Sequence, residues 1–211
     1  MKNLIKKHAK SFYWASFFLS KPVFNKCSCL YNFCRTLDDI VDDDKKLDIK
    51  KENFLKFKNE FIDRDNNNPI IKEMWSIIDE ERISKQVVMD LFSGVQTDLE
   101  EKVKINSKKE LLVYSYRVAG TVGLMMSKIL KVNNREALKG AIDLGIAMQL
   151  TNIARDVCED KARNRQYVSH NFSSIKEIIN ESQIFYNTSF HSISSIPLNS
   201  RFSVIVARRV Y

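Results

Sequence analysis

Residues 149–160 read QLTNIARDVCED, and the five residues before them form the apolar run LGIAM. On an α-helix of about 3.6 residues per turn, the side chains of Gln149, Asp156 and Asp160 point into an arc of about 40°, with Asn152 about 60° to one side. An otherwise apolar helix therefore carries one stripe of carboxylates and amides. This pattern predicts a helical protein in which a polar site faces an apolar interior.

A second acidic stripe lies at residues 38–44, which read DDIVDDD. In helical geometry Arg35, Asp38, Asp39 and Asp42 fall within an arc of about 100°. The residues before the stripe, CLYNFCRTL, are mostly apolar. Like charges four residues apart repel each other on a helix. Five aspartates in seven residues therefore predict a positively charged ligand at this place.

The residue types of both stripes favour a site for a metal ion and diphosphate. Short carboxylates on helices suit Mg²⁺ or Mn²⁺; Mg²⁺ takes few protein carboxylates and completes its shell with water and phosphate oxygens. Arginine suits diphosphate, which it binds through two hydrogen bonds. Two such helices around an apolar cavity favour ionisation of an allylic diphosphate. Each stripe alone also fits a simpler interpretation, a solvated helix end for residues 38–44 and an acidic surface turn for residues 155–160.

The rest of the sequence predicts an all-α fold in one domain, residues 1–211. Only 5 glycines and 3 prolines occur, and apolar residues recur mostly three and four positions apart. We expect helices over residues 3–19, 23–42, 48–63, 69–79, 83–101, 107–130, 134–161, 174–189 and 198–211. Residues 111–130 are the most membrane-like segment, and Arg117 near its middle favours a buried helix over a membrane span.

The chain carries a formal net charge of +8. Its lysines are scattered without a zinc-finger or RNA-binding signature, so a nucleic-acid partner is not expected, and such a partner would leave both acidic stripes unexplained. The four cysteines lack zinc-type spacing and predict reduced thiols in a cytoplasmic protein. No apolar signal peptide opens the sequence. The excess of basic residues also fits peripheral contact with the inner face of an anionic membrane.

Over nearly the whole chain the sequence resembles the squalene/phytoene synthase family, and within it the bacterial phytoene synthases; four stretches show this resemblance. The stretches are KKHAKSFYWASFFL, LYNFCRTLDDIVDD, YSYRVAGTVGLMM and AIDLGIAMQLTNIARDVCEDKARNRQYV, of which the last two are the specific ones. The resemblance implies a single-domain helical bundle of the class I isoprenoid synthase type around a central apolar cavity. It also implies that the family's last C-terminal helices are missing from residues 1–211.

The resemblance further implies roles for individual residues. The metal ion would be held by Asp38, Asp42, Asn152, Asp156 and Asp160. Substrate diphosphate would be bound by His8, Lys10, Ser11, Arg35, Gln149, Asn152 and Arg155. Tyr31 and Tyr116 would line the place where two substrates meet, beside Gln149, and would join the four aspartates in the catalytic set.

The reaction implied by the resemblance joins two geranylgeranyl diphosphates head to head. Loss of diphosphate from one gives an allylic cation, which the double bond of the other captures as a cyclopropyl (prephytoene) diphosphate. A second ionisation rearranges this compound to phytoene, the first committed step of carotenoid biosynthesis. No NADPH is expected for this reaction.

Three alternatives stay open at this point. Squalene and dehydrosqualene synthases share the metal motifs and act on farnesyl diphosphate, and the sequence does not give the depth of the cavity that selects chain length. A C-terminally truncated, non-catalytic member of the family would keep the helices without the chemistry. Chain-elongating prenyl transferases also have an aspartate-rich first motif, but their second motif is DDxxD, whereas DVCED keeps only the outer pair.

Overall fold

The computed structural model describes residues 18–132 and 134–210. This part of the chain is helical apart from two very short strands, which confirms the predicted all-α class. The elements are α3 (Lys21–Asp42), α4 (Leu47–Ile62), α5 (Pro69–Glu81), α6 (Lys85–Thr97), β1 (Val103–Lys104), α7 (Lys108–Ser115), the π-helical turn η1 (Tyr116–Gly120), α8 (Thr121–Ile129), α9 (Arg135–Arg155), α10 (Val157–Ala162), β2 (Arg165–Gln166), α11 (Phe172–Ser192), the 3₁₀ turn η2 (Ile193–Ser195) and α12 (Leu198–Val210). The predicted helix over residues 3–19 lies almost wholly outside the described residues.

Capping residues account for several of these boundaries. Pro69 occupies the first turn of α5, and the Asn68 side chain before it accepts hydrogen bonds from the Ile70 and Ile71 amides at 3.1 and 3.4 Å. The side chain of Asn134 caps α9 by accepting from the Glu136 amide at 2.8 Å. These caps satisfy amides that have no partner within the helix.

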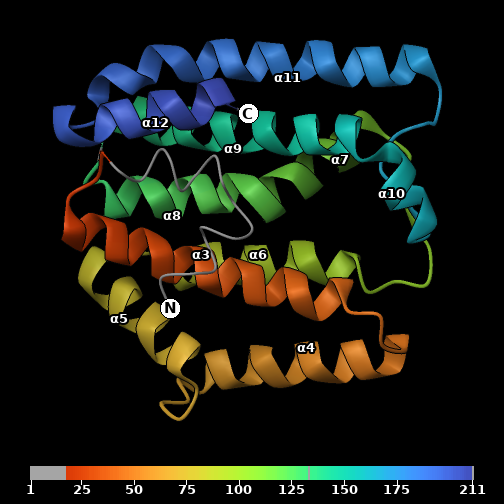
Figure 1. Cartoon of the computed structure of the whole chain (residues 1–211), viewed down its shortest axis with the longest axis horizontal. Helices are drawn as coiled ribbons and strands as arrows, with labels where there is room; N and C mark the ends of the chain where they lie inside the picture. Colours follow the sequence, from red (N-terminus) through yellow and green to blue (C-terminus); the bar gives the residue numbers. More distant parts are fainter. Residues whose placement is uncertain (1–17, 133, 211) are drawn as a thin grey trace.

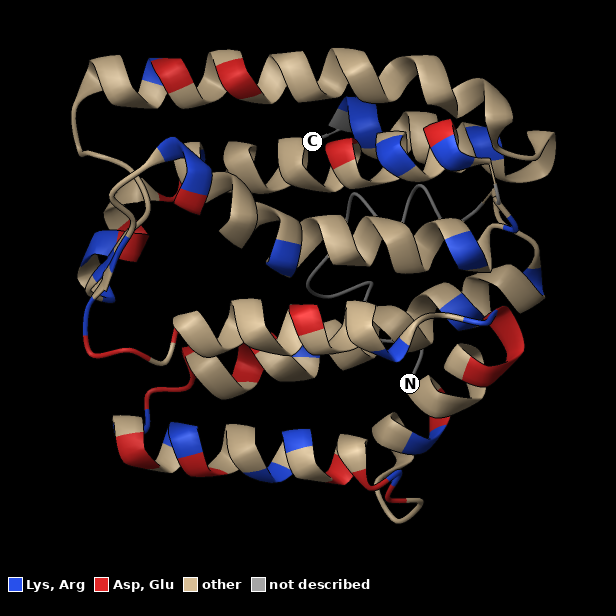
Figure 2. Ribbon diagram, turned by 180° about the vertical axis from the view of Figure 1, so that it is seen from behind, with Lys and Arg blue, Asp and Glu red and all other residues tan. Residues whose placement is uncertain are grey.

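Helices α3 and α9 run in the same direction and end on the same side of the molecule (Figure 1). The short helix α10 follows α9 directly on that side, so the two acidic stretches of the sequence come to one end of the bundle. Strands β1 and β2 lie at this end and pair in parallel, with Val103 opposite Arg165 and Lys104 opposite Gln166. In Figure 2 the acidic connection from α3 to α4 lies on the same side as the charged residues of α10.

An aromatic cluster holds α3, α4, α5 and α6 together. Phe33, Phe61 and Phe92 are fully buried, and their ring centroids lie 5.3 to 5.8 Å apart. Trp75 stacks on Phe61 at 4.9 Å and donates its indole N–H to the Phe61 carbonyl at 2.8 Å. Rings at these separations add to the free energy gained by burial. The cluster therefore gives α3 a rigid support behind its acidic end.

Helices α8 and α9 approach each other through glycines. A Cβ atom at Gly123 would lie 2.1 Å from the Ala141 carbonyl oxygen, and one at Gly145 would lie 2.4 Å from the Ala119 carbonyl oxygen. Only glycine allows backbones to pass this closely. The second glycine of GTVG and the glycine of LGIAM are thus explained by helix packing.

Two of the predicted helices are interrupted in the structure. The helix expected over residues 107–130 consists of α7, the π-helical turn and α8. The helix expected over residues 134–161 bends at Asp156, where α9 ends and α10 begins. Within the described part of the chain, no helix combines the length and apolar character needed to cross a lipid bilayer.

Glu81 at the end of α5 helps to hold the N-terminal end of α3. Its carboxylate is buried and pairs with Lys26 of α3 and with Lys131, which follows α8. Burial raises the pKa of Glu81, but the hydrogen bonds from Lys131 and Lys26 lower it by more than burial raises it. The pKa therefore lies below its ordinary value of 4.5.

We expect Glu81→Gln to lower the free energy of unfolding at pH 7 by about 1–3 kcal/mol, since it weakens two charge-assisted hydrogen bonds. A depressed carboxyl pKa stabilises the fold above the unfolded-state pKa, and this contribution is lost as the pH falls through the folded-state pKa. The difference between wild type and variant in urea unfolding should therefore narrow as the pH is lowered below 4.5. A difference that stays constant with pH would contradict this assignment.

Candidate functional site

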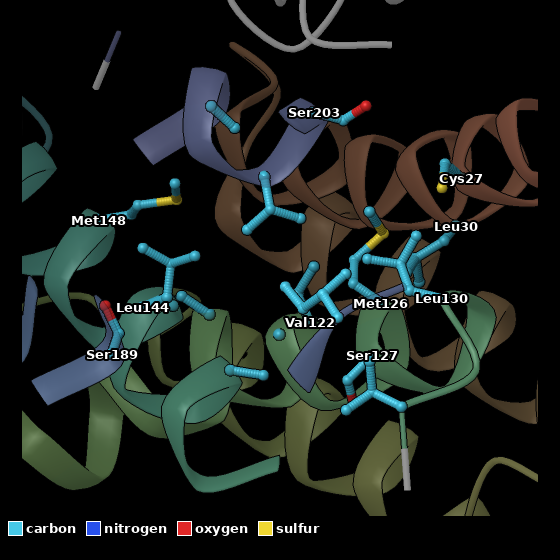
Figure 3. A pocket seen from close by; sticks show the side chains of 18 of the residues that line it. Cys27, Leu30, Val122, Met126, Ser127, Leu130, Leu144, Met148, Ser189 and Ser203 are labelled. Atoms are coloured by element: carbon cyan, nitrogen blue, oxygen red, sulfur yellow. The ribbon is translucent and has the colours of Figure 1, made fainter. Parts of the chain in front are cut away.

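A cavity of about 360 Å³ lies between α3, α8, α9, η2 and α12. Its volume falls within the range of small-molecule binding sites. Figure 3 shows the apolar side chains Val122, Met126, Leu144 and Met148 around it. Several serines also line the cavity, and some of their hydroxyls form hydrogen bonds within their own helix. For example, Ser189 donates to the Tyr186 carbonyl oxygen at 2.9 Å. The walls of the cavity are therefore mostly apolar.

The larger polar side chains that line the cavity come from α3 and α9. Tyr31 and Asp38 line it from α3, and Gln149 and Asn152 line it from α9. The Asn152 amide lies 3.5 Å from the Gln149 side-chain oxygen. Because α3 and α9 run in the same direction (Figure 1), Asp38 and Asn152, which lie near the C-terminal ends of these helices, are at the acidic end of the bundle. The cavity thus has a polar end and a long apolar remainder.

Asp38 is poorly neutralised in this setting. It lines the cavity and is exposed to solvent. Burial and the neighbouring Asp42 raise the pKa of Asp38 to about 7, and Arg35 opposes this rise only in part. Among the described residues, Arg35 therefore neutralises this carboxylate only in part, as is expected of a group that binds a cation.

Asp42, one turn further along α3, is held by two arginines that follow α10. Arg163 donates to Asp42 Oδ2 at 2.8 Å, and Arg165 donates to Asp42 Oδ1 at 2.8 Å. The two arginines differ in burial, with side chains 47% and 9% exposed, respectively. The contacts tie the first acidic motif to the segment just beyond the second motif.

The second acidic motif is formed by the bend between α9 and α10. Asp156 donates its amide to the Asn152 carbonyl at 2.8 Å, and its own carbonyl accepts from the Asp160 amide at 2.9 Å. Arg155 grips the Asp156 carboxylate through two hydrogen bonds of 2.6 Å. Burial and Asp156 raise the pKa of Asp160 to about 6, although Arg165 opposes the rise.

The carboxylates of the site come in pairs rather than in a closed cluster. Within residues 18–132 and 134–210, no three His, Cys, Asp or Glu side chains lie close enough to hold a metal ion by themselves. Asp38 and Asp42 form one pair, and Asp156 and Asp160 the other. Pairs of carboxylates fit Mg²⁺, which uses one or two of them and takes its remaining ligands from water and phosphate. The donor types thus suit this ion together with a phosphate-bearing ligand.

Residues 5–194 match the squalene/phytoene synthase family. This match covers most of the 211 residues and includes both acidic motifs. The chain belongs to the squalene/phytoene synthase family.

Within this family, the chain is 34% identical over 171 residues to a phytoene synthase of Rhodobacter capsulatus, which covers 79% of the chain and 50% of that protein. It is 25% identical over 236 residues to a 15-cis-phytoene synthase of Pantoea ananas, covering 96% of the chain and 76% of that protein. The chain thus spans about half the length of the Rhodobacter relative.

Solved structures of family enzymes have the same fold. A dehydrosqualene synthase crystallised with a ligand superposes with a TM-score of 0.83 at 27% sequence identity, over 100% of the chain and 81% of that structure. A squalene synthase of Alicyclobacillus acidocaldarius superposes with a TM-score of 0.77 over 99% of the chain and 88% of that structure. At 17% identity this second likeness concerns the fold alone. The predicted isoprenoid synthase fold is therefore confirmed.

The structure places some of the predicted site residues differently from the family-based expectation. Tyr31, Asp38, Gln149 and Asn152 line the cavity as expected. Tyr116 is not among the residues that line it; instead its hydroxyl donates to Asp90 at 3.3 Å. This difference follows from the π-helical turn that begins at Tyr116, because such a turn changes the direction of successive side chains.

The residues predicted to bind diphosphate also lie in different places. Arg35 pairs with Asp39 at 2.6 Å on the outer side of α3, and Arg155 pairs with Asp156. The predicted diphosphate ligands His8, Lys10 and Ser11 lie outside the described residues.

Four residues that the sequence analysis did not single out surround the first acidic motif. Asp98 at the end of α6, Tyr114 of α7, and Arg165 and Tyr167 after α10 form a hydrogen-bonded group behind Asp42. Asp98 and Tyr114 carry no motif of their own. Arg165 and Tyr167 fall within RNRQYV, which is part of a stretch that resembles the family. This resemblance was the sequence signal that could have identified them.

Proposed function

We propose that this family member condenses two molecules of geranylgeranyl diphosphate head to head and forms phytoene. The observation that carries the proposal is a cavity with mostly apolar walls, which Asp38 of the first aspartate pair lines from α3 and Asn152 lines from α9, four residues before Asp156 of the second pair. Phytoene synthases of Rhodobacter and Pantoea among the relatives support the choice of substrate.

The acidic end of the cavity would bind the diphosphate groups with Mg²⁺ or Mn²⁺. Such ions would be held by Asp38, Asp42, Asn152, Asp156 and Asp160. When bound, they supply positive charge that stabilises the departing diphosphate. Arg155 is exposed next to Asp156 and can exchange its carboxylate partner for a diphosphate oxygen. Arg35 on α3 can do the same from Asp39.

The apolar walls would hold both prenyl chains and keep water away from the allylic cation. Loss of diphosphate from the first substrate leaves a cation at its C1. The double bond of the second substrate attacks this carbon, and loss of a proton from the resulting cation closes the ring of the cyclopropyl diphosphate. A second loss of diphosphate, rearrangement and loss of a proton give phytoene, so no reductant is consumed. The ring of Tyr31 at the polar end can stabilise the cations, by about 0.5–2 kcal/mol.

A product assay tests the proposal directly. The purified protein is incubated with geranylgeranyl diphosphate and Mg²⁺, and the hydrocarbon extracted from the mixture is identified by mass spectrometry. Phytoene that disappears when a chelator is added supports both the reaction and the metal requirement. The second candidate is condensation of two farnesyl diphosphates, which the likeness to a dehydrosqualene synthase favours. A C30 hydrocarbon from farnesyl diphosphate, without phytoene, would replace the first proposal. No product from either substrate with folded protein would contradict an enzymatic role.

The cavity itself is tested by filling it. Leu144 of α9 points into its middle (Figure 3). We expect Leu144→Trp to reduce turnover by about tenfold or more, because misfit of a few atoms in an apolar pocket already changes transition-state binding by 1–3 kcal/mol. Leu144→Met, which nearly conserves volume, serves as the control. Equal turnover in wild type and in Leu144→Trp would show that the prenyl chains bind elsewhere.

A further inference from the structure

Asp98 is a partly buried carboxylate that lies outside the lining of the cavity and close to the first acidic motif. The Tyr167 hydroxyl donates to Asp98 Oδ1 at 2.6 Å, and the Tyr114 hydroxyl donates to Oδ2 at 2.9 Å. The two tyrosine rings stack at a centroid distance of 4.8 Å. Three segments far apart in sequence, the ends of α6 and α7 and the stretch after α10, thus meet at one carboxylate.

The hydrogen-bond geometry is that of an ionised aspartate. An ionised carboxylate only accepts hydrogen bonds, and each phenol supplies one proton. Burial raises the pKa of Asp98 above its ordinary value, and Arg165 and the two hydroxyls offset this rise only in part. The carboxylate therefore has two hydroxyl donors, and Arg165 is a cation near it.

Arg165 lies between Asp98 and the first acidic motif. One terminal nitrogen of Arg165 donates to Asp42 Oδ1 at 2.8 Å, and the other lies 3.2 Å from the Val41 carbonyl oxygen and 3.5 Å from that of Asp98. The backbone of Arg165 is fixed as well, since it pairs with Val103 in the β1–β2 ladder. A guanidinium that is buried and held from both sides keeps a defined position.

The two oxygens of Asp42 consequently differ in their surroundings. Oδ1 meets the buried Arg165, whereas Oδ2 meets Arg163, whose side chain is about half exposed. An exposed ion pair contributes little and exchanges readily. A cation from solution can displace Arg163 far more easily than Arg165.

We propose that Asp98, Tyr114 and Tyr167 position Arg165, and that Arg165 orients Asp42 so that its Oδ2 oxygen is presented to a divalent cation. This inference rests on the proposed function, because it assumes that Asp42 binds the cation that accompanies diphosphate. Asp98 and Arg165 are positioning residues here and touch neither the substrate nor the cation. Groups that orient a metal ligand from behind commonly change metal affinity by about 10–100-fold when they are removed.

Binding of Mn²⁺ in the presence of inorganic diphosphate, followed by the electron paramagnetic resonance signal of the free ion, tests the proposal without turnover. We expect Asp98→Asn to weaken Mn²⁺ binding by about tenfold or more. Tyr167→Phe should weaken it by a smaller factor, since it removes one of the two hydroxyl donors to Asp98. Unchanged affinity in folded Asp98→Asn would overturn the proposal.

Two control variants separate positioning from loss of stability. Glu81→Gln also removes a buried carboxylate charge, but Glu81 pairs with Lys26, which lies 16 residues, or about 24 Å of helix, from Asp42. It should unfold more easily and bind Mn²⁺ as wild type does. Arg163→Gln removes the competitor at Oδ2 and should bind Mn²⁺ as tightly as wild type or more tightly. Equal weakening in Asp98→Asn and Glu81→Gln would show a general structural effect and overturn the proposal.

The same measurement distinguishes failure of this inference from failure of the proposed function. Wild-type protein that binds Mn²⁺ with diphosphate but forms no hydrocarbon would contradict the proposed reaction, and a weaker Asp98→Asn would still support the positioning role. Wild-type protein that binds no Mn²⁺ would contradict both.

Discussion

Replacing Asp38 or Asp156 by asparagine is expected to lower the rate of hydrocarbon formation by about 10³-fold or more, with the protein still folded. The size of this expected loss follows from the several kcal/mol by which a bound metal ion stabilises the charge of a departing group. Asp38 lines the polar end of the cavity, and Asp156 forms the bend that begins the second motif. Asparagine keeps the size of each side chain and removes its charge. Product formation by mass spectrometry and helical content by circular dichroism measure the two effects.

Asp44→Asn provides the matched control for these variants. Asp44 belongs to the same acidic run, but it is exposed beyond the end of α3. We expect activity close to that of wild type. If Asp38→Asn or Asp156→Asn kept full activity, the assignment of the metal ligands would be wrong. If Asp44→Asn lost as much activity as they do, the run would act through its total charge and not through individual residues.

Gly123→Ala is expected to lower the free energy of unfolding by about 3 kcal/mol, at the upper end of overpacking effects. The added carbon would stand 2.1 Å from the Ala141 carbonyl oxygen, which belongs to the backbone of α9 and cannot turn away. Helices α8 and α9 would have to separate. Elsewhere in a helix the same substitution stabilises by up to about 1 kcal/mol, so even the sign of the effect is informative. Urea unfolding measures it.

Gly120→Ala, three residues earlier, is the control for helix propensity. A Cβ atom at Gly120 would meet Tyr116 Cδ2 at 3.0 Å and Ile142 Cγ2 at 3.1 Å, and both are side-chain atoms that can shift. We expect a change in unfolding free energy of about 1 kcal/mol or less in either direction. A Gly123→Ala variant as stable as wild type would mean that the two helices are not packed backbone to backbone.

The helices of the described chain could be predicted because their signals are local. Apolar residues at spacings of three and four predicted α3 to within two residues, and Asn68 with Pro69 predicted the start of α5. The bend at Asp156 was missed, since its neighbours keep the helical pattern of apolar residues on both sides. The pairing of β1 with β2 was missed as well, because strands of two residues are too short to show an alternating pattern.

The candidate site could be predicted only where its residues lie on one helix. The spacing of Asp38 and Asp42 places them on one face of α3, and Gln149 and Asn152 lie together on α9. The partners of Asp42 could not be found this way, because Arg163 and Arg165 lie more than a hundred residues further along the chain. Asp98 meets Tyr167 through tertiary packing alone, and no periodicity reports such a contact.

The π-helical turn at Tyr116–Gly120 has a geometric consequence for the two helices that it joins. A turn closed by i→i+5 hydrogen bonds contains one residue more than an α-helical turn, and one residue corresponds to about 100° of rotation. Helix α7 therefore directs Tyr114 toward Asp98, while α8 directs Val122 and Met126 toward the cavity. Removing a single residue here would turn one helix against the other and send Tyr114 away from its partner. The extra residue of the π-helical turn thus rotates α8 relative to α7, so that the two joined helices face two different neighbours.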